Sequence, residues 1–153
     1  MYICLTNSME MKTVYITRKE TFNAAHKLYK EEWSDDKNWE IFGKCSNKNW
    51  HGHNYTLFVT VKGIPNYETG FVINLKLLSQ IIKKEIIAHL DHKNMNLDVD
   101  FLKEIIPSTE NVIIRIWEQL KLPVEKVGGK LVRIKLIETE NNFVEYYGGE
   151  QPF

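Results

Sequence analysis

The sequence contains very little cysteine. Only two cysteines occur among 153 residues, Cys4 and Cys45, and Cys4 falls in a short N-terminal stretch that we expect to be flexible. A disulfide framework requires paired cysteines in an ordered fold and an oxidising compartment, so a structural disulfide is not expected. The scarcity of cysteine favours a reducing location, and we predict a cytoplasmic protein.

A long apolar run is also missing. The first residues, MYICLTNSMEMK, do not include the apolar segment of roughly 7 to 15 residues that a secretory signal peptide requires. No other segment approaches the ~20 apolar residues of a membrane-spanning helix. The sequence therefore gives no indication of export or of membrane insertion.

The chain has no net charge of either sign. Twenty basic and twenty acidic side chains cancel, so no global field attracts the protein to nucleic acid or to an anionic membrane. Hydrophobic residues at 43% and charged residues at 26% are typical of a soluble globular domain. We expect one domain over residues 12–153, preceded by a flexible extension at 1–11.

Hydrophobic periodicity predicts the element order β-β-α-α-β-β. In chain order we expect a strand at 12–22 that continues into FNAAH, a strand at 51–61, a helix at 74–90, a helix that begins at Ser108 or Thr109 and stops at Pro123, and a final hairpin with its turn at Asn141-Asn142. The sequence has no internal repeat. The pattern favours an α+β fold with a four-stranded antiparallel sheet and two helices on one face.

Each predicted helix carries an apolar stripe at helical spacing. The core positions expected on the two helices are Leu75, Leu78, Ile82 and Ile86 on the first, and Val112, Ile113, Ile116, Trp117 and Leu120 on the second. Both faces of the strand at 55–61 are substantially apolar, which favours association of the sheet with other copies of the chain. The segment 27–50 shows no sustained period and is long for a plain connection, so we expect a functional loop there.

The segment FGKCSNKNWHGHNY (42–55) concentrates reactive side chains. His51 and His53 lie two residues apart on a strand, so both imidazoles point to one side with Cα atoms ~6.5 Å apart. His26, at the end of FNAAH, is a candidate third ligand if the first strand pairs beside the second. Three neutral imidazoles leave one tetrahedral position open, as in catalytic zinc sites. The spacing alone equally fits hydrogen-bonded surface histidines.

Four further groups could carry chemistry, and each also has a structural interpretation. Cys45 lies in a polar loop where Lys44 and a metal ion could favour the thiolate, or it is an inert thiol. Asp91-His92 is a possible proton relay or a helix-end cap. The carboxylates of Glu110 and Glu138 are either functional or, respectively, a first-turn helix glutamate and a solvated side chain at a strand end.

Taken together, the motifs resemble the 6-pyruvoyltetrahydropterin synthase family over about Val14 to Glu150. The matching segments, in order, are FNAAHKL, FGKCSNKNWHGHNY, TGFVINL, LDHKNMNLDV, STENV, LIETENN and YYGGE. The resemblance implies the tunnelling fold (T-fold), in which three protomers close their sheets into a twelve-stranded barrel. It further implies a homohexamer built from two trimers, with active sites at subunit interfaces and without nucleic-acid or membrane partners.

The resemblance also implies the roles of individual residues. It gives zinc ligands at His26, His51 and His53, a catalytic cysteine at Cys45, a proton-relay pair at Asp91 and His92, and pterin-binding residues at Glu138, Thr109 and Glu110. The implied reaction converts 7,8-dihydroneopterin triphosphate to 6-pyruvoyltetrahydropterin with loss of triphosphate, using Zn²⁺ and no redox cofactor. For the triphosphate, Lys27, Lys44, Lys48 and Arg18 are candidates on position alone.

Two related branches and one other class compete with this assignment. The 6-carboxytetrahydropterin synthases typically have three residues between the cysteine and HGH, whereas five separate Cys45 from His51 here. The branch that makes 6-hydroxymethyldihydropterin characteristically has a glutamate in or near the cysteine position, and Glu40 lies five residues before Cys45. The third alternative is a catalytically silent pterin-binding protein, against which the complete set of cysteine and histidines argues.

Overall fold

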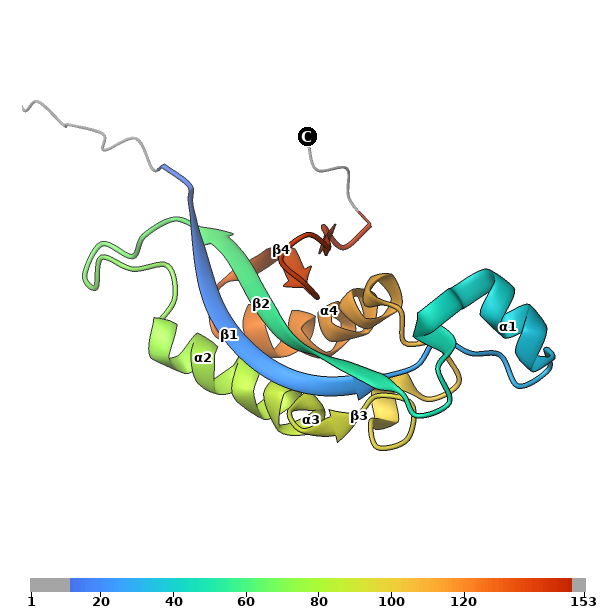
Figure 1. Cartoon of the computed structure of the whole chain (residues 1–153). Coiled ribbons are helices and arrows are strands. Elements are labelled where there is room, and N and C mark those ends of the chain that lie inside the picture. Colours follow the sequence, from blue (N-terminus) through green and yellow to red (C-terminus); the bar gives the residue numbers. More distant parts are fainter. Residues whose placement is uncertain (1–11, 150–153) are drawn as a thin grey trace, which may run out of the picture.

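Two long antiparallel strands form the centre of the structure. The computed structural model describes residues 12–149, in which β1 (Val14–His26) and β2 (His51–Gly63) each span 13 residues. They lie in a sheet of order β3-β1-β2-β4-β5, completed by β3 (Lys93–Asn94), β4 (Lys130–Ile137) and β5 (Phe143–Tyr146). The sheet is strongly curved, and helices cover one of its faces (Figure 1).

The strand predictions are confirmed with shifted bounds. β1 begins at Val14 rather than Lys12 and continues past Phe22 to His26, because its ladder with β2 extends through FNAAH until His26 faces His51. On β2 the predicted alternation is present, and Tyr55, Leu57, Val59 and Val61 are all buried. In the turn that joins β4 to β5, the Asn142 carbonyl accepts backbone hydrogen bonds from Glu138 and Thr139. The turn lies where the sequence predicts it.

The first predicted helix is present as three consecutive segments. They are α2 (Leu75–Ile82), the π-helical turn η2 (Lys83–Ile87) and α3 (Ala88–Leu90). Three of the four predicted core positions, Leu78, Ile82 and Ile86, are fully buried. The prediction for Leu75 is wrong, because this residue opens the helix after the Asn74 cap and its side chain is 44% exposed.

The second predicted helix is α4 (Thr109–Glu125), and the Ser108 side chain accepts a hydrogen bond at its N-terminus. All five predicted core positions of this helix are buried. The predicted stop at Pro123 is wrong, since the helix continues to Glu125. Proline removes only one backbone donor in this last turn, and the buried Val124 side chain anchors the turn to the core.

Segment 27–50 contains regular structure that the sequence analysis did not predict. It forms α1 (Asp35–Phe42), followed by the 3₁₀ turn η1 (Gly43–Ser46). The buried Asn38 amide bonds the Lys30 backbone and the carbonyls of Trp33 and Ser34, which fixes the helix to the preceding chain. An eight-residue, mostly polar helix has too little apolar periodicity to be visible in the sequence.

The sheet has one strand more than the predicted four. Residues Lys93–Asn94 form β3, which pairs parallel with β1 beside Ala24 and Ala25, and the 3₁₀ turn η3 (Asp100–Leu102) follows. A two-residue strand of Lys and Asn has neither β propensity nor alternation, so the pairing follows from tertiary contact. The predicted flexible extension at 1–11 lies outside the described residues.

The helices α2 and α4 pack on one face of the sheet, and no helix of residues 12–149 covers the other face. Side chains of the open face include Tyr15, Thr17, Lys19 and Phe58, of which Tyr15 is 65% exposed. Over the same residues, none of the helices has the length and apolar character needed to cross a membrane.

Candidate metal centre and active site

Three histidines meet where β1 ends and β2 begins. His26 faces His51 across the antiparallel ladder, and His53 follows on the same side of β2. One nitrogen from each ring can be chosen so that all three lie within 4.8 Å of one another, which small side-chain rotations would close around one ion. Gly52 allows this approach, because a Cβ there would lie 2.9 Å from the Ala24 carbonyl oxygen.

Hydrogen bonding fixes the ring orientation of His26. Its Nδ1 lies 2.8 Å from the Pro107 carbonyl oxygen, which can only accept, so Nδ1 carries the proton and Nε2 presents its lone pair to the cluster. The Nε2 atom of His26 and the Nδ1 atom of His51 are buried without a hydrogen-bond partner in residues 12–149. Buried polar atoms without partners are rare in folded proteins, and a metal ion would satisfy both.

The surroundings favour the neutral form of His26 and of His51. Burial lowers the pKa of His26 below its usual value, although the Pro107 carbonyl and the Glu138 carboxylate oppose the shift. Burial also lowers the pKa of His51, and the nearby His26 and His53 imidazoles lower it further. Since a metal binds the neutral imidazole, the lowered pKa values of His26 and His51 favour metal binding at neutral pH.

We expect the metal-free protein to lose stability as the pH falls below the ordinary histidine pKa of 6.5. The folded-state pKa of His26 is depressed, so between the two values the unfolded chain binds more protons than the folded one. The contribution to stability is therefore complete above 6.5 and decreases as the pH falls through the folded-state pKa. Urea denaturation one pH unit above and one below 6.5 measures the decrease in the free energy of unfolding. This decrease should be smaller in His26→Asn. Equal decreases in both proteins would contradict the prediction.

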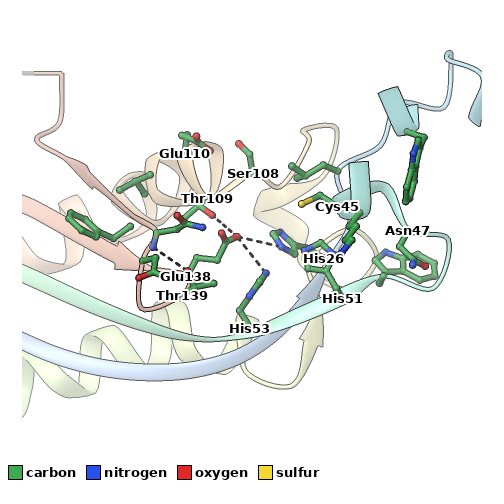
Figure 2. A pocket seen from close by; sticks show the side chains of 18 residues that line it. His26, Cys45, Asn47, His51, His53, Ser108, Thr109, Glu110, Glu138 and Thr139 are labelled. Carbon is green, nitrogen blue, oxygen red and sulfur yellow. Dashed lines mark hydrogen bonds and ion pairs between the residues drawn. The ribbon is translucent and has the colours of Figure 1, made fainter. Parts of the chain in front are cut away.

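The histidine cluster opens into a cavity of about 970 Å³. Seven of the site residues predicted from the sequence line this cavity: His26, Cys45, His51, His53, Thr109, Glu110 and Glu138. The other two, Asp91 and His92, do not. The lining comes from η1, the ends of β1 and β2, the start of α4 and the β4–β5 turn. Figure 2 shows Glu138 and Thr109 on one side of His26 and Asn47 on the other, with the Cys45 sulfur beside His26.

Glu138 lies directly after β4 and points toward the histidine cluster. Its Oε1 atom is 3.6 Å from Nε2 of His26 and 3.7 Å from Nε2 of His53. The Thr109 hydroxyl donates to the same oxygen at 2.8 Å, which orients the carboxylate. A partly buried carboxylate held in this way is suited to accept hydrogen bonds from a ligand with adjacent N–H donors.

Cys45 lies in η1, and its side chain is partly exposed to the cavity. Its carbonyl oxygen accepts a hydrogen bond of 2.9 Å from the Leu28 backbone, so the short turn is tied to the chain just after β1. The turn η1 thus holds the thiol beside the histidine cluster. A thiol in this position can act on a molecule bound in the cavity.

Asp91 and His92 lie apart from this cavity in the single chain. The pair forms its predicted contact, with His92 Nδ1 3.0 Å from Asp91 Oδ2. A hydrogen bond from the Asn23 backbone, and then one from His92, lowers the pKa of Asp91. The His92 side chain is 81% exposed, so the pair faces outward. Glu40, the alternative base, is also exposed and absent from the described lining of the cavity.

Several aromatic and amide side chains of the cavity wall were not predicted from the sequence. They include Trp39, Asn47, Trp50, Asn142 and Phe143. Trp50 is notable because its backbone φ of 60° is unusual for a residue other than glycine, and its buried indole nitrogen has no partner in residues 12–149. Its position directly before His51 was the one signal in the sequence that could have identified it.

The chain is similar to proteins of known activity over most of its length. Residues 15–149 match the family model for 6-pyruvoyl tetrahydropterin synthase. The 6-pyruvoyl tetrahydrobiopterin synthase of Pongo abelii is 44% identical over 87% of this chain and 90% of its own length. The solved structure of Caenorhabditis elegans 6-pyruvoyl tetrahydropterin synthase superposes with a TM-score of 0.82 at 36% identity, covering 91% of this chain and 98% of that one.

A neighbouring branch is more distant. The 6-carboxy-5,6,7,8-tetrahydropterin synthase of Bacillus subtilis is 30% identical over 70% of this chain and 73% of its own length. The identity is thus lower, over a shorter alignment, than for the Pongo abelii protein.

Proposed function

This chain belongs to the 6-pyruvoyl tetrahydropterin synthase family, and on that premise we propose that it converts 7,8-dihydroneopterin triphosphate to 6-pyruvoyltetrahydropterin and triphosphate. The observation that carries the proposal is that three histidines able to hold one metal ion share a single cavity with the Cys45 thiol and the Glu138 carboxylate. This arrangement supports a triphosphate-eliminating lyase that holds a pterin at one end and acts on its side chain at the other.

The metal we propose is zinc, held by His26, His51 and His53. Imidazole donors in a set of three, with a cavity in front of them, suit catalytic zinc. Bound there, zinc would act as a Lewis acid toward the side-chain oxygens of the substrate. The protein contributes the fixed tautomer of His26, through the Pro107 hydrogen bond, and the lowered pKa values of His26 and His51, through burial.

Glu138 would anchor the pterin ring. Its carboxylate can accept two hydrogen bonds from the 2-amino group and N3–H of the ring, while Thr109 holds one oxygen in place. The ring then lies on the Glu138 side of the histidines and its side chain extends toward Cys45. In this position the Cys45 thiolate is the proposed base, which removes a proton from a side-chain carbon.

We expect Glu138→Gln to weaken pterin binding by about 10- to 100-fold, because a neutral amide loses a charge-assisted hydrogen bond and presents a donor where an acceptor is needed. Calorimetric titration with 7,8-dihydroneopterin measures the affinity. Glu140→Gln is the matched control, since Glu140 is exposed two residues later and does not line the cavity. Equal affinities for the two variants would remove Glu138 from this role.

The outward-facing Asp91–His92 pair supports a site shared between subunits. We propose that the open sheet face closes into the twelve-stranded barrel of a trimer, that two trimers form a hexamer, and that a neighbouring copy brings His92 to the cavity. Sedimentation at micromolar concentration is expected to give about six times the 18.1 kDa chain mass. A monomer would refute the assembly.

Subunit mixing tests the shared site directly. Cys45→Ala and His92→Ala chains, each nearly inactive alone, should recover activity when co-assembled, because some interfaces then combine an intact Cys45 with an intact His92. Random mixing of equal amounts restores at most about one quarter of the sites. No recovery in verified mixed hexamers would place both residues within one chain's site.

Product analysis tests the reaction. We expect 6-pyruvoyltetrahydropterin, trapped by a downstream reductase, together with triphosphate. A 6-carboxy product would favour the branch of the Bacillus subtilis relative, and 6-hydroxymethyldihydropterin would favour the Glu40 alternative. Pterin binding without turnover would favour the silent binding protein.

A further inference from the structure

A second cavity adjoins the first at the end away from Glu138. It has a volume of about 530 Å³ and is lined by Lys27, Tyr29, Asp35, Asp36, Trp39, Ser46, Asn47 and Lys48. Trp39 and Asn47 line both cavities. Asn47 lies beyond Cys45 and the histidines when viewed from Glu138 (Figure 2), so a ligand that begins at Glu138 and passes the histidines reaches this junction.

The Lys27 ammonium group lies at the boundary between the two cavities. Its Nζ is 4.3 Å from the ring centre of Tyr29 and 4.8 Å from that of Trp50, and Trp50 lines the first cavity. The Lys27 backbone is held by the Asn96 amide, which accepts from its N–H at 2.8 Å and donates to its carbonyl at 2.9 Å. The cation is therefore positioned before any ligand arrives.

Three lysines line the two cavities without carboxylate partners in the described residues. Lys44 lines the first cavity and Lys27 and Lys48 line the second, and none of the three forms an ion pair within residues 12–149. Arg18, the fourth candidate from the sequence, is different. It is paired with Glu20 at 2.8 Å and lines neither cavity.

Two neutral donors add to the lysines. The buried Nε1 of Trp50 has no partner in the described residues, and Asn47 offers an amide at the junction. The second cavity also has acidic lining residues, Asp35 and Asp36 at the start of α1, and Asp35 accepts a hydrogen bond from the Tyr29 hydroxyl at 2.8 Å. Neither aspartate forms an ion pair with Lys27 or Lys48 within residues 12–149.

We propose that this junction, formed by Lys27, Lys44 and Lys48 with Asn47 and the Trp50 indole, binds the triphosphate group of the substrate and retains it after elimination. The inference rests on the proposed function. Polyphosphate oxygens accept hydrogen bonds from ammonium and indole N–H groups, and a pterin held at Glu138 directs its tail to this end of the cavity. The subsite would select phosphorylated over unphosphorylated pterins.

Inorganic tripolyphosphate is the probe, titrated calorimetrically into zinc-free protein so that it cannot ligate the metal. We expect the double variant Lys27→Met, Lys48→Met to bind it at least ~10-fold more weakly than the unmodified chain, as loss of two charge-assisted contacts requires. Lys44 is left intact because it adjoins Cys45. Lys37→Met is the matched control: Lys37 lies on α1 and stacks on a ring, Trp33, at 4.3 Å, but lines neither cavity. It should bind like the unmodified chain.

A second measurement separates this proposal from the proposed function. The double variant should bind 7,8-dihydroneopterin, which lacks phosphate, as tightly as the unmodified chain, and it should show a raised KM for the triphosphate form. Unchanged tripolyphosphate affinity, or an equal loss in Lys37→Met, would overturn the subsite. If the double variant lost as much affinity for 7,8-dihydroneopterin as for tripolyphosphate, the subsite would also be overturned, because the effect would then be structural. Failure of the unmodified chain to turn over the triphosphate substrate would instead refute the proposed function.

Discussion

Cys45→Ala is expected to lower turnover of 7,8-dihydroneopterin triphosphate by about 10²- to 10⁴-fold, the range typical of losing a positioned acid or base. The thiol lies on the cavity wall and belongs neither to the histidine cluster nor to the proposed pterin anchor. Zinc content and affinity for 7,8-dihydroneopterin should therefore be unchanged. Steady-state kinetics, metal analysis and calorimetry on the same preparation measure the three quantities.

Glu40→Gln is the comparison for this variant. Glu40 is exposed and absent from the described lining of the cavity, so we expect its turnover and product to match those of the unmodified chain. If Cys45→Ala kept substantial turnover with 6-hydroxymethyldihydropterin as product, and Glu40→Gln abolished it, Glu40 would be the base. Near-normal formation of 6-pyruvoyltetrahydropterin by Cys45→Ala would exclude Cys45 from the proposed role.

His51→Ala is expected to abolish both stoichiometric zinc and activity. With two imidazoles left, the site loses a direct ligand, and the affinity should fall by more than the ~10- to 100-fold that loss of an outer-shell partner causes. Metal analysis after dialysis should give about one zinc per chain in the unmodified protein and little in the variant. His89→Ala is the control, because His89 is exposed and lies against Phe101 rather than in the cluster.

Full zinc occupancy together with full activity in His51→Ala would contradict the three-histidine site. Zinc lost from the variant with activity retained would separate the metal from the reaction. Both results can be read from protein whose fold is checked by circular dichroism, so a misfolded variant is recognised.

Much of the site could be predicted because strand geometry is local. Residues two apart on a strand point to the same face of the sheet. The His51 and His53 side chains therefore had to lie on one face, whatever the position of the strand in the fold. The buried alternation from Tyr55 to Val61 followed from the same rule. His26 required one further assumption, antiparallel pairing of the first two strands, and the register that sets it opposite His51 confirmed that assumption.

Other features could not be predicted from local pattern. Helix α1 is short and polar, so the buried Asn38 that holds it is not visible as periodicity. The strand β3 exists only because Lys93 and Asn94 lie beside Ala24 and Ala25. The outward position of His92 depends in the same way on where the end of α3 packs against β1.

The sequence by itself determined the residue types of the site, the side of β2 on which two of the proposed metal ligands lie and the order of the principal elements, since each depends on spacing along one segment. Only the tertiary structure decided that Glu138 approaches His26 and His53, that Asp91 and His92 face away from the same chain's cavity, and that Lys27 lies at a junction of two cavities. These relations join segments tens of residues apart. Their distances are set by sheet register and helix packing, which no local pattern encodes.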